Sequence, residues 1–117
     1  MKLTDYNFPE KELKFGNLLP VMDEFGFVHA EQWDYERVMF DYKMLDERVN
    51  ATYYLRVPAY AVEGDIPGED TIVKLMTPIV GRHYYPHGVE YDEEMPSKVL
   101  NKCATKLKGI EEGLKGF

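Results

Sequence analysis

The stretch Tyr35–Val62 reads YERVMFDYKMLDERVNATYYLRVPAYAV and contains two runs in which apolar and polar residues alternate. Successive side chains of a β-strand point to opposite faces, so each run predicts a half-buried strand. The polar interval Asp46–Asn50 between them predicts a hairpin turn. The apolar positions are Val38, Phe40, Tyr42 and Met44 in the first run, and Tyr53, Leu55, Val57 and Ala59 in the second.

Further strands are expected beyond this hairpin. The loop Gly64–Asp70 separates it from a strand over Thr71–Thr77, and Ile79–Gly81 either continues that strand or begins another. Pro58 lacks an N–H, so it belongs at an edge, a bulge or a bend of its strand. The sequence pattern is less regular after Pro78, and in the polar-aromatic segment Arg82–Gly88 the residues Pro86 and Gly88 argue against any regular element beyond it. Connections this short join antiparallel strands, which predicts a meander.

A helix is expected on each side of this β region. The first begins near Leu18, with Pro20 in its first turn and Gly26 at its C-terminus. Whether the lead-in before it adds a strand is left open by the residues. The second helix follows Pro96. Its apolar stripe is Val99, Cys103, Leu107, Ile110 and Leu114, with Lys98, Lys102 and Lys106 on a neighbouring, solvated face.

Together these elements predict a single α+β domain over residues 1–117. A half-buried sheet must cover its apolar face, and the two helices are the natural cover. We therefore expect an antiparallel four- or five-stranded meander that is covered on one face by an N-terminal and a C-terminal helix. The length of 117 residues fits one domain better than two.

Composition limits the classes of partner and the compartment. The net charge is −7, and residues 29–96 carry fourteen acidic against six basic side chains, which disfavours nucleic acid as a partner. No stretch approaches the roughly 20 apolar residues of a membrane span, so no membrane partner is expected. Cys103 is the only cysteine, which excludes an internal disulfide and favours a reducing compartment. The expected location is the cytoplasm.

Aromatic and basic side chains gather in the β region. Eight of the nine tyrosines lie between Tyr35 and Tyr91, with Trp33 just before them. Tyrosine suits pockets and interfaces, so the segment could line a cleft for a small anionic or aromatic ligand. The alternative is that tyrosine simply packs well on a pleated surface. The candidate binding residues are Arg56, Tyr60, Arg82, His83, Tyr84, Tyr85 and His87.

A metal site is a second hypothesis for the same segment. His83, His87 and Glu90 have ligand chemistry for a transition metal. On a helix the spacing of the two histidines would place them on one face, but Pro86 and Gly88 disfavour a helix here. The alternative is a pair of loop histidines bonded to backbone or solvent, and no cofactor is predicted.

Four tracts of the chain resemble a known family. They are Gly26–Val28, Gln32–Val38, Tyr53–Asp65 and His83–Tyr91, and together they are similar to the YugN-like family of small proteins from Bacillus and its relatives. The resemblance covers nearly the whole chain. It implies a compact α+β domain in the cytoplasm of a spore-forming bacterium and brings no catalytic residues with it.

Two hypotheses of function follow. The first is a non-enzymatic binding or regulatory module that uses the Tyr/Arg-rich sheet face and the 82–91 segment, with a homodimer as one form of it. The second is a small-molecule enzyme or metal sensor in which Arg82, His83, His87 and Glu90 are the working groups. The second requires Arg82, His83 and His87 to converge on one concavity.

Overall fold

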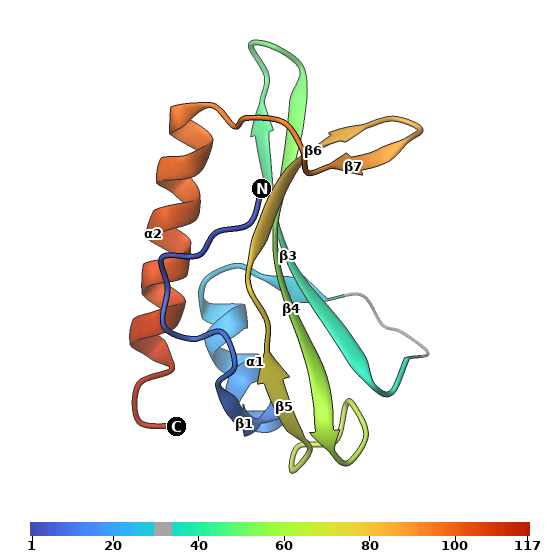
Figure 1. Cartoon of the computed structure of the whole chain (residues 1–117), viewed down its shortest axis with the longest axis vertical. Helices are drawn as coiled ribbons and strands as arrows, with labels where there is room; N and C mark the ends of the chain where they lie inside the picture. The colour runs from blue at the N-terminus through green and yellow to red at the C-terminus, as the bar shows by residue number, and fades with distance from the viewer. Residues whose placement is uncertain (30–33) are drawn as a thin grey trace.

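The structure is a computed structural model that describes residues 1–29 and 34–117. Trp33 therefore lies outside the described residues. Seven strands form one antiparallel sheet, and two helices complete the fold (Figure 1). The elements are β1 (Glu12–Lys14), α1 (Phe15–Glu24), β2 (Val28–His29), β3 (Arg37–Asp46), β4 (Ala51–Glu63), β5 (Ile72–Leu75), β6 (Ile79–Tyr84), β7 (Gly88–Glu90) and α2 (Ser97–Gly113). The α+β class is confirmed, with more strands than expected.

The long hairpin β3–β4 forms the centre of the sheet, as its alternating pattern predicts. Asp46 pairs with Ala51 next to the turn, and the ladder continues without a shift to Arg37 and Tyr60. Short β2 pairs with β3 on the other side. The apolar positions of both central strands face the core, with Tyr42 only half-buried. The predicted register of faces is therefore confirmed.

The second edge of β4 is shared by two strands. Its first half pairs with β6 and its second half with β5, so β6 returns to β4 and the predicted simple meander is wrong beyond β5. The carbonyl of Pro58 accepts a hydrogen bond from the N–H of Met76, between the two partner strands. N–H and C=O of one strand residue point to the same side. The missing N–H of Pro58 thus faces the interval where β5 has ended and β6 has not begun.

The lead-in adds strand pairing that the sequence left undecided. β1 pairs with β5 through Leu13 and Val73. Near the start of the chain, Lys2 bridges to Ile79, and the N–H of Leu3 donates to the carbonyl of Pro78 at 2.9 Å. Residues that precede α1 therefore cover the outer edges of both β5 and the start of β6.

Helix α1 begins at Phe15, three residues earlier than expected, and Pro20 lies inside it. The N–H groups of Phe15 and Gly16 donate to the carbonyls of Thr71 and Glu69, at 2.8 and 3.0 Å. These bonds satisfy donors that a helix leaves free at its start, and they come from a loop more than fifty residues away. Gly26 adopts a φ of 81° after the helix, as predicted.

Helix α2 buries the apolar stripe that the sequence predicts, from Val99 to Leu114. Both helices lie on the same side of the sheet (Figure 1). Two of the three lysines expected to be solvated have partners instead. Lys98 lies 2.9 Å from a carboxylate oxygen of Asp46, and the ammonium of Lys106 lies 4.5 Å from the ring centroid of Tyr42. No helix in the described part of the chain is long and apolar enough to cross a membrane.

The expectation of no regular element beyond the segment Arg82–Gly88 is wrong, because β7 pairs with β6 in a short hairpin. Gly88 has a φ of 87° and begins β7, so the glycine supplies a turn rather than a break. The hairpin projects from the sheet on the side away from α2 (Figure 1).

Candidate functional site

The face of the sheet away from the helices, which we call the outer face, carries the side chains that alternate with the core positions. Cross-strand neighbours on this face belong to β3, β4, β5 and β6, because the ladders fix which residues lie opposite one another. Most of them are half-buried or exposed. They are Arg37, Met39, Asp41, Lys43, Leu45, Thr52, Tyr54, Arg56, Pro58, Tyr60, Lys74, Ile79, Gly81 and His83.

Arg56 makes the most contacts at the centre of this face. It lies opposite Asp41, with its Nε 3.2 Å from Oδ1 of that carboxylate. One terminal nitrogen of its guanidinium donates to the hydroxyl of Tyr91 at 2.8 Å. The guanidinium carbon lies 5.2 Å from the ring centroid of Tyr54, within the range of a cation–π contact. Arg56 therefore ties together β3, β4 and the segment after β7.

The position of Tyr91 depends on a glycine. Gly81 points to the outer face, where a Cβ would come within 2.8 Å of Cδ1 of Tyr91 and 2.6 Å of Cγ1 of Val89. Distances below 3 Å are not tolerated by real Cβ atoms. The absence of a side chain at Gly81 thus lets the chain after β7 cross close over β6 and deliver the tyrosine hydroxyl to Arg56.

Asp41 is about seven-tenths buried, and that burial changes its acidity. Loss of water raises the pKa of its carboxyl above the ordinary value, and the charge of Arg56 opposes this rise. The pair is a structural link across β3 and β4, with little of either side chain left to contact a ligand.

Tyr60, a predicted binding residue, lies on the outer face between two cations. Its register neighbours are Arg37 on β3 and Lys74 on β5. Arg56 and Tyr60 therefore share the outer face, as the hypothesis of a Tyr/Arg-rich surface requires.

Arg82 and His83 point to opposite faces of β6. Arg82 lies opposite the buried Tyr53, on the core side, and His83 lies opposite Thr52, on the outer side. Consecutive residues of a strand cannot share a face. Arg82 stacks at 4.9 Å from the ring centroid of Tyr84, and His83 makes an edge contact with Tyr54 at 6.0 Å.

Tyr85 and His87 occupy the turn of the β6–β7 hairpin, where both are exposed. The side chain of Tyr85 is 90% exposed, more than any other large hydrophobic side chain in the described part of the chain. Tyr84 points away from this tip: its hydroxyl lies 2.7 Å from Glu93, and that hydrogen bond raises the pKa of the phenol. The structure thus spreads Arg82, His83 and His87 over two faces and a turn.

The three proposed metal ligands are also not brought together. Glu90 lies opposite Arg82, which places it on the other face of the hairpin from His83. His87 is in the turn between them. Within residues 1–29 and 34–117, no group of three or more His, Cys, Asp or Glu side chains is positioned to hold a metal ion.

Sequence reasoning did not single out Asp41 or Tyr91, which complete the Arg56 cluster. A signal for Asp41 was present. A hairpin with Asp46 paired to Ala51 places Asp41 opposite Arg56 by counting along both strands. Tyr91 had no such signal, because its position depends on the hairpin and on the space left by Gly81.

Comparison with known proteins gives consistent results. The model of the YugN-like family matches residues 5–109. The chain is 38% identical to an uncharacterized protein of Bacillus subtilis, YlbA, over 98% of this chain and 96% of that protein. It is 33% identical to a second uncharacterized B. subtilis protein, YugN, over 60% of this chain and 51% of that protein. A crystal structure of an uncharacterized conserved protein YugN from Geobacillus kaustophilus superposes with a TM-score of 0.84 at 37% identity, over 98% and 95% of the two chains.

Proposed function

The chain belongs to the YugN-like family, and from this premise we propose that it is a non-enzymatic binding module that works as a homodimer, with its outer face packed against that of a second copy. The observation that carries the proposal is the open outer face itself. Both helices lie on the other side of the sheet, so no helix of the described residues covers this face over β3 and the second half of β4 (Figure 1).

The outer face is more apolar than a solvated sheet face requires. Met39, Pro58 and Met76 line a shallow concavity of about 440 Å³ near the middle of β4. Met76 and Leu45 are 45% and 63% exposed. Sheets with one wet face normally alternate apolar and polar residues, and exposed apolar patches mark interaction sites.

The apolar part of this face favours a second copy as the occupant. A two-fold axis in the interface, perpendicular to the strands, packs the same patch of both copies together, so Met39, Pro58 and Met76 of one copy meet apolar side chains of the other. Such an interface is isologous, and facing sheets pack about 10 Å apart.

The spread of Arg82, His83 and His87 supports a binding role over the enzyme or sensor hypothesis. Acid–base chemistry needs groups within hydrogen-bond reach of one reacting atom, and these three side chains start from two faces and a turn. The net charge of −7 supports a protein partner over nucleic acid. The free, buried Cys103 supports a location in the reducing cytoplasm.

Sedimentation velocity over a range of micromolar concentrations tests the proposal. We expect a dimer for the unchanged protein and a monomer for Met76→Glu, which places a charge on the outer face. The matched control is Val49→Glu, at an exposed residue of the β3–β4 turn. It should remain a dimer.

A protein that sediments as a monomer at every concentration overturns the homodimer. A dimer that persists in Met76→Glu, or is lost equally in Val49→Glu, places the interface elsewhere and overturns the role of the outer face.

A further inference from the structure

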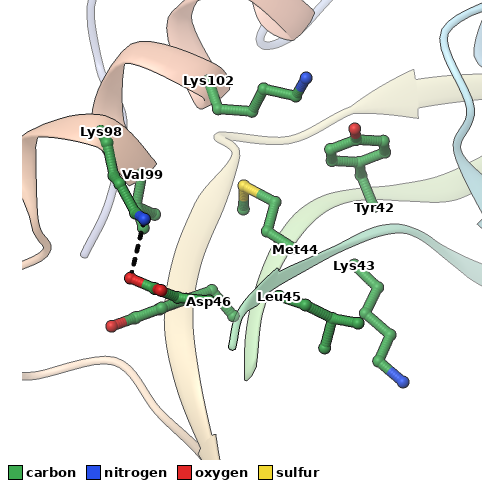
Figure 2. Close-up of a pocket in the computed structure, with 9 residues that line it drawn as sticks. Tyr42, Lys43, Met44, Leu45, Asp46, Lys98, Val99 and Lys102 are labelled. Atoms are coloured by element: carbon green, nitrogen blue, oxygen red, sulfur yellow. Dashed lines mark ion pairs between the residues drawn. The ribbon is translucent and has the colours of Figure 1, made fainter. Parts of the chain in front are cut away.

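A cavity of about 330 Å³ lies on the opposite side of the sheet, between the end of β3 and the first turns of α2 (Figure 2). This volume is at the lower end of the range for small-molecule sites. The cavity lies away from the β6–β7 hairpin. It borders the outer face only at Lys43 and Leu45, whose side chains point away from the space (Figure 2). Its lining residues are Tyr42, Lys43, Met44, Leu45, Asp46, Tyr53, Lys98, Val99 and Lys102.

The inner wall of the cavity is apolar. Met44, Tyr53 and Val99 belong to the core and are 9%, 3% and 4% exposed. Met44 lies in the middle of the space in Figure 2, with the ring of Tyr42 beside it. A methionine adapts its shape to a neighbouring group, and a tyrosine ring offers a flat contact surface. An apolar or aromatic body would therefore find complementary walls.

The rim of the cavity carries the ammonium groups of Lys98 and Lys102 and the carboxylate of Asp46. Lys98 and Lys102 are four residues apart on α2, so they lie on one face of the helix. In Figure 2 they flank the space on the helix side, whereas Lys43 and Leu45 point away from it. The net positive charge is confined to this part of the chain. Residues 97–117 carry five lysines and two glutamates, whereas the whole chain has a net charge of −7.

The three lysines of this helix face differ in what they contact. Lys98 pairs with Oδ2 of Asp46, whose Oδ1 lies 3.6 Å from Nε of Arg48. Lys106 lies over the ring of Tyr42. Lys102 stands between them and forms no ion pair or cation–π contact with the residues that the structure describes. Its ammonium is the one left to meet a ligand at this rim.

From this arrangement we propose that the cavity binds a small organic anion. Its carboxylate or phosphate group contacts the ammonium of Lys102, and its apolar or aromatic body contacts Met44, Val99 and Tyr42. A charge-assisted hydrogen bond to a lysine supplies the recognition of the anion. The site needs no second copy of the chain, so it does not depend on the homodimer.

Nuclear magnetic resonance of the methionine methyl groups tests this site directly. Benzoate and phenyl phosphate are the anionic probes, and benzamide is the uncharged control of the same shape. We expect the Met44 methyl signal to shift in a saturable way with either anion. The shift with benzamide should stay far from saturation at the same concentrations. Benzoate and phenyl phosphate together show which anionic group the rim prefers.

Two glutamine variants on α2 test whether the ammonium of Lys102 binds the anion. Lys102→Gln should weaken benzoate binding about fivefold, the equivalent of about 1 kcal/mol. Lys108→Gln removes an exposed lysine away from the cavity and should leave the affinity unchanged. Both positions are exposed, so neither change should unfold the protein. Met76→Glu, expected to be monomeric, should bind benzoate as the unchanged protein does.

The proposal is overturned if benzamide binds as tightly as benzoate, or if Lys108→Gln weakens binding as much as Lys102→Gln does. It is also overturned if the Met44 methyl shift is linear, without saturation, for both anions. Loss of binding in Met76→Glu alone would make the site dependent on the dimer interface and overturn its independence.

Discussion

Gly109 of α2 lies directly against the aromatic ring of Phe25, the residue at the C-terminus of α1. A Cβ at Gly109 would come within 2.8 Å of Cδ1 of that ring, and a Cβ at Gly113 within 2.9 Å of Cγ1 of Val21. A glycine inside a helix costs up to about 1 kcal/mol against alanine. At these two positions the glycines allow the two helices to approach closely.

Gly109→Ala should therefore lower the free energy of unfolding by about 1–2 kcal/mol, because overpacking outweighs the gain in helix propensity. Urea denaturation measures the change. Thr105→Ala, at an exposed position of the same helix, controls for propensity. Adding Phe25→Ala should recover part of the loss in Gly109→Ala, and strictly additive effects of the two changes would contradict the contact.

Asp46 should make the protein sensitive to acid. Its interaction with Lys98 lowers the pKa of the carboxyl below the ordinary value of 3.8. A lowered folded-state pKa gives stability that is complete above the ordinary value and is lost as the pH falls through the lowered one. Urea midpoints measured from neutral to strongly acidic pH should therefore fall less steeply for Asp46→Asn than for the unchanged protein.

The control for this measurement is Asp70→Asn. Asp70 pairs with Lys14 at 3.4 Å but is 93% exposed, so its removal should hardly change the acid response. An identical response of Asp46→Asn and the unchanged protein would show that the Lys98 pair does not contribute.

Arg56→Met should lower the free energy of unfolding by about 1–3 kcal/mol at neutral pH, because Asp41 then keeps a half-buried charge without a partner. Loss of the cation raises the pKa of Asp41 further. A raised carboxyl pKa costs stability while the group is ionised, so the loss should shrink as the pH falls through the raised value. Equilibrium unfolding at several pH values measures this.

Two variants separate the contacts of Arg56. Tyr91→Phe removes only the hydroxyl and should cost about 0.5–1.5 kcal/mol. Asp41→Asn combined with Arg56→Met should recover much of the stability that Arg56→Met loses. A loss in Arg56→Met that is the same at all pH values would count against the role of Asp41.

Cys103 should be chemically silent in the folded protein. It is 1% exposed, and burial raises the pKa of its thiol to about 11, so little reactive thiolate is present at neutral pH. A disulfide reagent should label it only after denaturant is added. A cysteine placed at exposed position 105, in a Cys103→Ser background, should react at once. Rapid labelling of Cys103 in the native state would contradict its burial.

The sequence predicts local features of this fold well. The alternation over β3 and β4 and the stripe on α2 depend on side-chain periodicity alone, and both are confirmed. The start of α1 was misjudged because its first N–H groups bond to carbonyls at Glu69 and Thr71, far along the chain. No local pattern contains that information.

The candidate site was harder to predict for the same reason. The sequence pattern is less regular after Pro78, so alternation alone does not assign Arg82 and His83 to the faces of a strand. Once β6 is a strand, Arg82 and His83 must point to opposite faces. The cavity beside α2 depends on how Lys98 and Lys102 meet the end of β3, a contact between residues more than fifty positions apart.

Opposite Pro58, one edge of β4 changes its pairing partner from β6 to β5. On the β5 side of Pro58, β5 pairs with β1, which leads directly into α1. On the β6 side, β6 pairs with β7 to form the hairpin whose turn contains Tyr85. The tip of that hairpin could be lengthened or replaced without altering any pairing of β5. The hairpin tip is therefore a place where the length of this chain can vary while the rest of the sheet keeps its pairing.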